Sequence, residues 1–459
     1  MRLIGKLLKW LAILAAVIVV VFAGWLYVAP PALIQVAAGY SAKIVCSNVF
    51  IADRDSREVL KVDVQAPGHP ILGLIAMNVD REAKTAHASL LGMFGGGVAV
   101  AREGAGCSSV PDGNEEAAKL APVPVAAGAA SQALSPEGES VEPSQDPAVK
   151  AILDDAGMAG PGMRAIVVVK NGRIVGERYG EGFSEATPLL GWSMTKTVTA
   201  AIIGTLVREG KLGLDDTGLF EAWKADGRGA IKLRDLMSMS SGLEFNEDYG
   251  DVTDVTRMLY LEPDMAAFAA AKPLAHEIGK VFSYSSGTTV MLSRIWQNAA
   301  GADALAWPRR ELFDPIGMRS AVLEADARGT FVGSSYLYAS ARDWARFGQF
   351  LLQDGLWNGE AILPAGYAAV MRAPSSAAPA EYTQGQMWLN GPSAGTPDGQ
   401  DPDAGFDLPA DTVWALGHDG QSMAIVPSKQ LVVVRLGLTP SKLGYKSQAM
   451  VAALVKALP

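Results

Sequence analysis

The chain has 459 residues, and 39 Lys and Arg against 48 Asp and Glu give a formal net charge of −9 at pH 7. This acidic balance argues against general binding to nucleic acid. The length predicts more than one domain and a large core. Hydrophobic residues make up 49% and charged residues 19% of the chain, which is typical of a globular protein with an added membrane segment.

The N-terminal region, residues 1–34, is predicted to be a membrane anchor. Residues 10–29 carry no charge and are long enough to span a bilayer. The basic residues before this run, which favour a cytoplasmic N-terminus, are Arg2, Lys6 and Lys9. A cleaved signal peptide is the alternative, although no convincing cleavage site precedes Pro30. Both interpretations export the rest of the chain, and the first places it in the periplasm, anchored in a bacterial inner membrane.

Residues 35–110 are predicted to form a small β-rich cap. Its expected strands are 43–45, 58–64, 71–79, 86–91 and 97–101. Cys46 and Cys107 are the only cysteines, and in an oxidising compartment they are expected to form a disulfide. Two free buried thiols are the alternative. Residues 111–146 are rich in Ala, Pro, Ser, Glu and Gly and lack aromatic residues, which indicates a linker.

The main domain, residues 147–459, is predicted to have an α+β fold. Two strands, 164–170 and 173–179, flank Asn171-Gly172, which is a strong hairpin signal. Later strands are expected at 413–417, 422–427 and 431–438, and a closing helix at 445–458. Strands at both ends with helices between them indicate one antiparallel sheet with helices on its faces and an inserted helical subdomain.

A candidate nucleophile stands at the start of a helix that is apolar on nearly every face from residue 198 to 207 and ends at Gly210. Ser193 and Lys196 are three residues apart, so their side chains share one face. Burial favours the neutral amine, and the helix start favours an alkoxide. Activated serines need both conditions. Ser-x-x-Lys occurs about once by chance in a chain of this length, so partners are needed elsewhere.

Two other motifs supply possible partners. Tyr284 and Ser286 alternate on a loop between helical stretches, so their hydroxyls can face one side. The segment Gly417-His418-Asp419-Gly420-Gln421-Ser422 opens a late strand. Its glycines, Gly420 among them, allow a close approach of the backbone to a ligand.

These three motifs together resemble the serine β-lactamase and penicillin-binding protein superfamily, which carries Ser-x-x-Lys, Tyr-x-Asn or Tyr-x-Ser, and a Lys-Thr-Gly-like strand in this order. The chain is most similar to the class C-like branch, and within it to 6-aminohexanoate-dimer hydrolases. The segments that carry this closer likeness are 193–196, 239–243, 247–249, 284–286 and 338–346. The resemblance covers residue 151 to the C-terminus and implies a β-lactamase/transpeptidase-like sandwich.

The resemblance also implies roles in catalysis. Ser193 would attack an amide or ester carbonyl, Lys196 would help to remove its proton, and Tyr284 would protonate the leaving group, its acidity raised by Lys196. Backbone N–H groups of Ser193 and Gln421 would form the oxyanion hole.

The remaining candidates have structural alternatives. Tyr249 would contact the scissile amide or be a surface residue. Ser286 would bind near the substrate or stabilise a turn. His418, which stands where penicillin-recognising enzymes carry lysine, would bind substrate or pack, and Gly420 would lie beside the substrate.

The departures from the superfamily pattern bear on the substrate. His418-Asp419-Gly420 replaces Lys-Thr-Gly, so the cation that grips a β-lactam or peptide carboxylate is missing. We therefore expect a serine hydrolase acting on a small linear amide or ester. A penicillin-binding D,D-peptidase or β-lactamase is one alternative, and a non-catalytic binding or sensor protein is another. No metal-ligand cluster or phosphate loop is visible, so no metal, cofactor or nucleic-acid partner is predicted, and the oligomeric state is left open.

Overall fold

The computed structural model describes residues 2–119, 123 and 146–459, so most of the predicted linker 111–146 lies outside the described residues. The chain divides into two compact units. The first contains Met1–Ala101, Cys107–Ala118 and Asp248–Pro263, and the second contains Arg102–Gly106, Lys119–Glu247 and Asp264–Pro459. Two short stretches thus depart from the predicted domain boundaries: 102–106 belongs to the second unit, and 248–263 belongs to the first.

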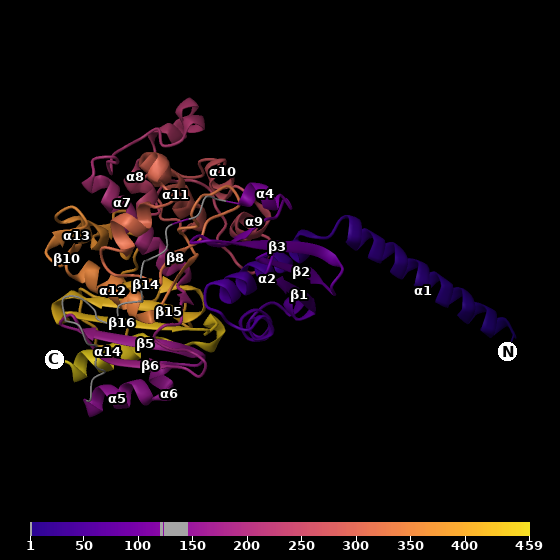
Figure 1. The fold of residues 1–459 in the computed structure, drawn as a ribbon, viewed down its shortest axis with the longest axis horizontal. Coiled ribbons are helices and arrows are strands. Elements are labelled where there is room, and N and C mark those ends of the chain that lie inside the picture. Colours follow the sequence, from indigo (N-terminus) through magenta and orange to yellow (C-terminus); the bar gives the residue numbers. More distant parts are fainter. Residues whose placement is uncertain (1, 120–122, 124–145) are drawn as a thin grey trace. The chain divides into compact units, whose positions relative to one another are not determined.

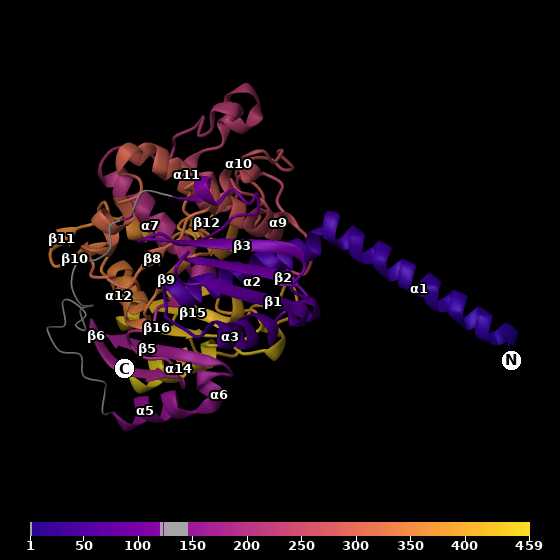
Figure 2. The ribbon, with the colours of Figure 1, turned by 45° about the vertical axis from the view of Figure 1, so that its right-hand side comes forward.

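The first unit combines helices with a small sheet. Its helical elements are α1 (Arg2–Val28), α2 (Ala32–Phe50), α3 (Ser56–Val59), the π-helical η1 (Leu60–Gln65), the 3₁₀ turn η2 (Pro70–Leu74), α4 (Glu115–Ala118) and α9 (Asp254–Leu261). The strands β1 (Ile75–Asp80), β2 (Thr85–Leu90), β3 (Phe94–Arg102) and β4 (Gly106–Ser109) follow one another in the sheet in sequence order. Helix α2 packs along this sheet (Figure 2).

Two of the strands predicted for this unit were wrong. Residues 43–45 lie inside α2, and residues 58–64 lie in α3 and η1. Residues 43–45 are all buried within α2, and so short a buried run has no periodicity that separates a strand from a helix. Small residues let other elements approach α2 closely: a Cβ on Gly97 of β3 would lie 2.4 Å from the carbonyl carbon of Ala38, and one on Gly39 would lie 3.1 Å from Tyr260.

The predicted disulfide between Cys46 and Cys107 is confirmed and joins α2 to β4. By length and composition, α1 and α2 could each cross a membrane. They differ in burial, because 78% of the apolar window of α2 is buried inside the protein and none of that of α1. We therefore interpret α2 as a core helix of the first unit, which leaves α1 as the candidate anchor.

The second unit is built on the predicted antiparallel sheet, whose strand order is β14-β15-β16-β5-β6 (Figure 1). Its strands are β5 (Met163–Lys170), β6 (Arg173–Tyr179), β14 (Val413–Gly417), β15 (Gln421–Val426) and β16 (Leu431–Gly437). The register pairs Val433 with Val168 across the middle of the sheet. Asn171 and Gly172 both have positive φ, 52° and 77°, as the predicted tight hairpin requires.

Helices cover both faces of this sheet, which confirms the predicted sandwich. The helices α5 (Pro147–Asp154), α6 (Ala156–Ala159) and α14 (Gln448–Ala457) contribute to one core cluster with the sheet. Helix α12 (Ala341–Leu352) packs on strands β5, β15 and β16. A Cβ on Gly348 of α12 would lie 2.5 Å from the side chain of Val432, so the two layers are in close contact.

The remaining elements of the second unit lie between β6 and β14 in the chain. The helices are α7 (Thr195–Arg208), α8 (Leu233–Met237), α10 (Met265–Ala270), α11 (Ser286–Ala300) and α13 (Tyr367–Arg372). Short strands form three small sheets: β7 (Leu189–Leu190), β9 (Leu337–Ala339) and β8 (Val322–Leu323); β10 (Leu356–Trp357) and β11 (Glu360–Ala361); and β12 (Pro374–Ser375) and β13 (Ala378–Thr383). Helices α7 and α11 pack against each other.

Candidate active site

Helix α7 begins within the Ser-x-x-Lys motif and lies in the interior of the second unit. All residues from Thr195 to Leu206 are buried, and the helix ends before Gly210, whose φ is +67°, as predicted. Ser193 lies in the 3₁₀ turn η3 (Trp192–Met194), which leads into the helix. Trp192 has a φ of +48°, a value that is uncommon for a residue with a side chain and that is found at functional sites.

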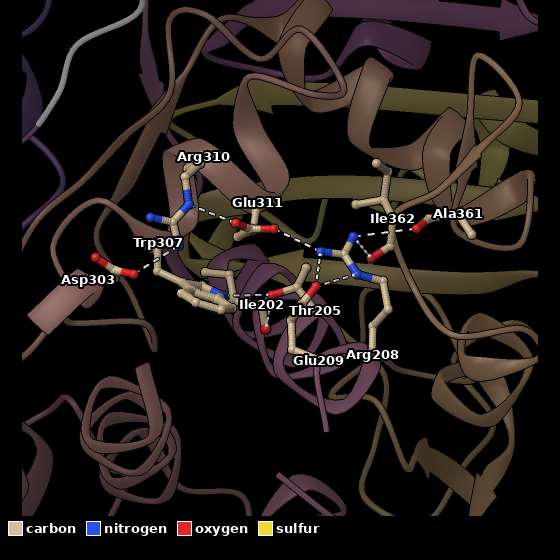
Figure 3. A network of polar contacts seen from close by, with 10 residues as sticks. All are labelled: Ile202, Thr205, Arg208, Glu209, Asp303, Trp307, Arg310, Glu311, Ala361 and Ile362. Carbon is tan, nitrogen blue, oxygen red and sulfur yellow. Dashed lines mark hydrogen bonds and ion pairs between the residues drawn. The ribbon is translucent and has the colours of Figure 1, made fainter. Parts of the chain in front are cut away.

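A polar network fixes the other end of α7 (Figure 3). Arg208 donates to Glu311 at 2.8 Å and to the carbonyl of Ile362 at 3.0 Å. Trp307 Nε1 donates to Thr205 Oγ1 at 2.9 Å. This end is thus tied to two separate segments, around residues 307–311 and at Ile362, so α7 cannot shift along its axis without breaking these bonds. The bonds therefore help to fix the position of the serine at the other end.

Lys196 contacts Ser193, as the spacing predicted. The amine Nζ lies 3.0 Å from Ser193 Oγ, 3.0 Å from Ser286 Oγ and 3.1 Å from the carbonyl oxygen of Ser334. These partners match the three donors of an ammonium group. Lys196 is 1% exposed, and this burial lowers its pKa to about 8, while Glu247 acts in the opposite direction. A sizeable fraction of the amine, about a tenth, is therefore neutral and able to accept a proton at pH 7.

Glu247 is a site residue to which the sequence analysis assigned no role. Its carboxylate accepts a hydrogen bond from the backbone N–H of Ser286 at 2.7 Å and another from Ser286 Oγ. Burial raises the pKa of Glu247, although Lys196 and the bonds from Ser286 oppose this effect. Its segment, residues 247–249, is one of those that carry the family resemblance, and this was the only signal in the sequence, because Glu247 has no spacing relation to Lys196.

Tyr284 and Ser286 do share one side, as predicted. Ser286 begins α11 and lies between Lys196 and Glu247. The Tyr284 hydroxyl is hydrogen-bonded to Ser193, and its ring centroid lies 4.7 Å from Lys196 Nζ. The ammonium therefore contacts the ring face, which is a cation–π geometry.

The expected increase in the acidity of Tyr284 is not found. Its pKa is raised, first by burial and then by the negative charge of Glu247, and the hydrogen bond to Ser193 only partly offsets this. The pKa of Tyr284 is not lowered because the Lys196 ammonium lies over the ring rather than beside the hydroxyl. Tyr284 consequently keeps its proton at neutral pH and is suited to donate it.

Aromatic side chains surround Tyr284. Its ring lies 5.9 Å from that of Tyr382 in an edge-to-face arrangement and 5.2 Å from that of Trp388. Phe282 packs on the same two residues. The Tyr382 hydroxyl is buried and has no hydrogen-bond partner among the described residues. This cluster gives the neighbourhood of Tyr284 an apolar wall.

His418 lies beside the turn that carries the serine. Its side chain is 49% exposed, and Nε2 lies 3.5 Å from Asp419 Oδ1. The imidazole ring meets the ring of Trp192 edge to face, with centroids 5.6 Å apart. This exposed position next to the residue before Ser193 is compatible with substrate contact, which stays a prediction.

Gly420 and Gln421 fasten the hairpin between β14 and β15. The carbonyl of Gly420 accepts a bond from Arg435 at 2.9 Å. The Gln421 side chain accepts from the N–H of Gly437 at 2.8 Å and donates to its carbonyl at 2.6 Å. In the strand register Gln421 is paired with Gly417. The oxyanion role predicted for the Gln421 N–H stays a prediction.

The edge of β14 that faces away from β15 offers a second backbone donor. Trp414 exchanges hydrogen bonds with Trp388 beyond this edge, at 2.9 and 2.8 Å. Because alternate residues of a strand direct their N–H groups to opposite sides, Leu416 presents its N–H on the same edge as Trp414. The next residue, Gly417, lies close to the serine turn, since a Cβ there would be 2.3 Å from the carbonyl oxygen of Gly191.

Tyr249 falls in the first unit, in the stretch Asp248–Pro263, and is 37% exposed. Its predicted contact with a scissile amide stays a prediction. Among the described residues, no group of three or more His, Cys, Asp or Glu could hold a metal ion.

Comparisons with known proteins identify the family and the fold of the main domain. Residues 151–446 match the model of the family described as Beta-lactamase. The chain is 22% identical over 304 residues to the 6-aminohexanoate-dimer hydrolase of Paenarthrobacter ureafaciens, a match that covers 60% of this chain and 72% of that protein.

Solved structures show the same fold. One from Bacillus anthracis, provisionally named a 6-aminohexanoate-dimer hydrolase, has 25% identity and a TM-score of 0.55, and the match covers 78% of this chain and 89% of that one. A penicillin-binding protein homologue from Caulobacter crescentus has 16% identity and a TM-score of 0.51, with 70% of this chain and 99% of that one covered.

Proposed function

Because the chain belongs to the Beta-lactamase family, we propose that it is a serine hydrolase that cleaves a small linear amide or ester through an acyl-enzyme on Ser193. The observation that carries the proposal is the contact of 3.0 Å between Ser193 Oγ and a buried lysine whose pKa is lowered to about 8. A nucleophile and a base within hydrogen-bond reach are what covalent catalysis by serine requires.

In the proposed acylation, neutral Lys196 accepts the proton of Ser193 as Oγ attacks the substrate carbonyl. The tetrahedral intermediate then collapses, and the amine or alkoxide leaves with a proton from Tyr284, whose hydroxyl is bonded to Ser193. The proton held by the Lys196 ammonium then passes to the Tyr284 phenolate, which restores the neutral amine and the tyrosine hydroxyl. Water attacks the acyl-enzyme next, and proton transfer in the reverse sense releases the acid and restores Ser193.

Backbone N–H groups would stabilise the oxyanion. The N–H of Ser193 is one donor, and the second is that of Gln421 or, as the edge position of β14 suggests, that of Leu416. Removal of one such donor typically costs about 3 kcal/mol of transition-state stabilisation.

The residues around the serine bear on the substrate class. Lys196 is buried and Glu247 is partly buried, and both are hydrogen-bonded to Ser286, so neither is placed to bind a substrate charge. His418 supplies no fixed cation of the kind that lysine provides. Together with the apolar wall around Tyr284 and the relative named 6-aminohexanoate-dimer hydrolase, this supports a neutral linear substrate over a β-lactam or a peptidoglycan peptide.

We also propose that α1 anchors the protein in a bacterial inner membrane, with the chain after α1 on the periplasmic side. The unburied apolar helix and the disulfide support this location.

Labelling with a fluorophosphonate probe tests the proposed function. The parent protein should be labelled, at a rate that rises with pH through about 8 as Lys196 loses its proton. Labelling should vanish in Ser193→Ala and fall by about 10³-fold or more in Lys196→Ala. A folded parent protein that stays unlabelled would favour the binding-protein alternative. Rapid acylation of Ser193 by a labelled penicillin would favour the D,D-peptidase or β-lactamase alternative.

A further inference from the structure

The turn between β3 and β4, residues Arg102–Gly106, belongs by its contacts to the second unit. Arg102 is 9% exposed and donates from Nη1 to the carbonyl of Asp326 at 3.0 Å and from Nη2 to the carbonyl of Ala325. At the other end of the turn, Gly106 has a φ of +58°, and a Cβ there would lie 2.5 Å from Glu324 Oε1. Both ends of the turn thus contact one short stretch, residues 324–326.

This stretch is one side of a narrow hairpin that ends at Val332. The N–H of Val332 donates to the carbonyl of Glu324, and the N–H of Asp326 donates to the carbonyl of Thr330, both at 2.8 Å. The Asp326 carboxylate accepts the N–H groups of Arg328 and Thr330, each at 2.9 Å. With these bonds across it, the hairpin should move as one piece.

The residues after the hairpin hold the catalytic lysine. The carbonyl of Gly333 accepts a bond from Thr199 Oγ1 at 2.9 Å, and a Cβ on Gly333 would lie 2.3 Å from that oxygen and 2.5 Å from Ser293 Oγ. The carbonyl of Ser334, the next residue, accepts the bond from Lys196 at 3.1 Å. There is no free space at Gly333, so a shift of the hairpin is passed to the Ser334 carbonyl.

We propose that Arg102 is a positioning residue for Lys196 and acts through the hairpin 324–332 and the carbonyl of Ser334. The inference rests on the proposed function. Arg102 lies outside the family match at residues 151–446, so a residue from outside this match would help to position the active site. The guanidinium suits this task because it offers a rigid fork of donors to two adjacent carbonyls.

Charge supports the same assignment. Burial lowers the pKa of Arg102 to about 10, and the nearby Glu324 and Asp326 oppose this decrease. Arg102 therefore remains a cation at neutral pH. A neutral residue at this position would remove both carbonyl bonds and the positive charge beside these two acidic residues.

The test compares the full-length parent protein with Arg102→Ala and Arg102→Lys. The rate of fluorophosphonate labelling should fall roughly ten- to hundredfold in Arg102→Ala, because small displacements of a base from its nucleophile have effects of this size. If the Ser334 carbonyl withdraws and water reaches Lys196, the pKa of the amine should rise from about 8 toward its ordinary value of 10.5. The acid limb of the labelling rate should then move to higher pH. Arg102→Lys keeps the charge and one donor to the carbonyls, so it should restore part of the rate.

Other ionisable groups need to be held constant in this comparison. Glu247 and Tyr284 are the titratable groups that face Lys196 among the described residues, and both stay unchanged. Arg81→Ala is the matched control, because Arg81 is 61% exposed and its ion pair with Asp53 is at the surface of the first unit. It should leave the rate and the pH profile as in the parent.

Two results would contradict the role of Arg102 while leaving the proposed function intact. One is an Arg102→Ala protein labelled at the parental rate with the parental acid limb. The other is a lower melting temperature with an unmoved acid limb in both variants, which would show that Arg102 only stabilises the fold. If Arg102→Ala does not fold, Arg102→Lys alone decides between these outcomes. An unlabelled parent protein would instead contradict the proposed function itself.

Discussion

Helices α2 and α7 each contain a buried lysine that is hydrogen-bonded to a serine, yet only one pair has the surroundings of a catalytic site. In α2, Lys43 is 1% exposed and donates to Ser47 Oγ at 2.8 Å. In α7, Lys196 is equally buried and donates to Ser193 Oγ at 3.0 Å. The pairs are similar in distance and in the burial of the amine.

The position of the serine separates the two pairs. Ser47 lies in the interior of α2, is fully buried, and its hydroxyl donates to the carbonyl of Lys43 at 3.0 Å. Ser193 precedes α7, is partly exposed, and has Tyr284 as a further partner. A buried amine beside a serine is therefore compatible with a structural role. Access for a substrate and a second proton donor distinguish the candidate nucleophile.

Among the variants that test the difference between the two lysine–serine pairs, Tyr284→Phe should have the largest effect on activity. Loss of the proposed proton donor should lower the hydrolysis of ethyl butyrate by about 10²- to 10⁴-fold, the range of general acid catalysis. Hydrolysis of p-nitrophenyl butyrate should fall much less, because its leaving group departs as an anion.

Tyr382→Phe is the matched control, since the Tyr382 hydroxyl is buried without a partner among the described residues. This variant should retain activity on both esters and be more stable, by about 1 kcal/mol in urea unfolding, because an unsatisfied polar group is removed. Equal losses on the two esters in Tyr284→Phe would contradict its role as a proton donor.

Glu247→Gln should have a smaller effect, which is a shift of the pH dependence of labelling toward lower pH. The negative charge of Glu247 raises the pKa of Lys196, so its removal should lower that pKa below about 8 and populate more neutral amine at pH 7. The acid limb of fluorophosphonate labelling should move to lower pH. This shift is opposite to the one expected for Arg102→Ala.

Glu244→Gln serves as the control for Glu247→Gln, because Glu244 is exposed and three residues away in the chain. Its acid limb should coincide with that of the parent. An acid limb that moves to higher pH in Glu247→Gln would show that Glu247 supports the neutral amine, contrary to the proposal.

Ser47→Ala has the smallest expected effect and addresses the α2 pair directly. Loss of a buried hydrogen bond to Lys43 should reduce the free energy of unfolding by about 1–2 kcal/mol. The labelling rate per folded molecule should stay the same, as measured with an active-site titration. A loss of labelling in folded Ser47→Ala protein would show that the two pairs are not functionally distinct.

The local patterns of the main domain predicted its structure well. Asn171-Gly172 specified a hairpin because both residues tolerate positive φ, and the apolar helix after Ser193 with Gly210 at its end specified α7. The first unit was less predictable. Residues 43–45, a lysine followed by two apolar residues, are all buried in α2, and so short a run shows neither the alternation of a strand nor the stripe of a surface helix.

The sequence by itself determined which chemical groups are present and which neighbours in the chain share a face: Ser193 with Lys196, Tyr284 with Ser286, and an oxidisable pair of cysteines. Only the tertiary structure decided what surrounds them. It brought Glu247 to Ser286 across 39 positions of the chain and the carbonyl of Ser334 to Lys196 across 138. It also raised the pKa of Tyr284 where an opposite shift was expected. These effects depend on burial and on charges at short distances in space, and neither quantity is a function of spacing along the chain.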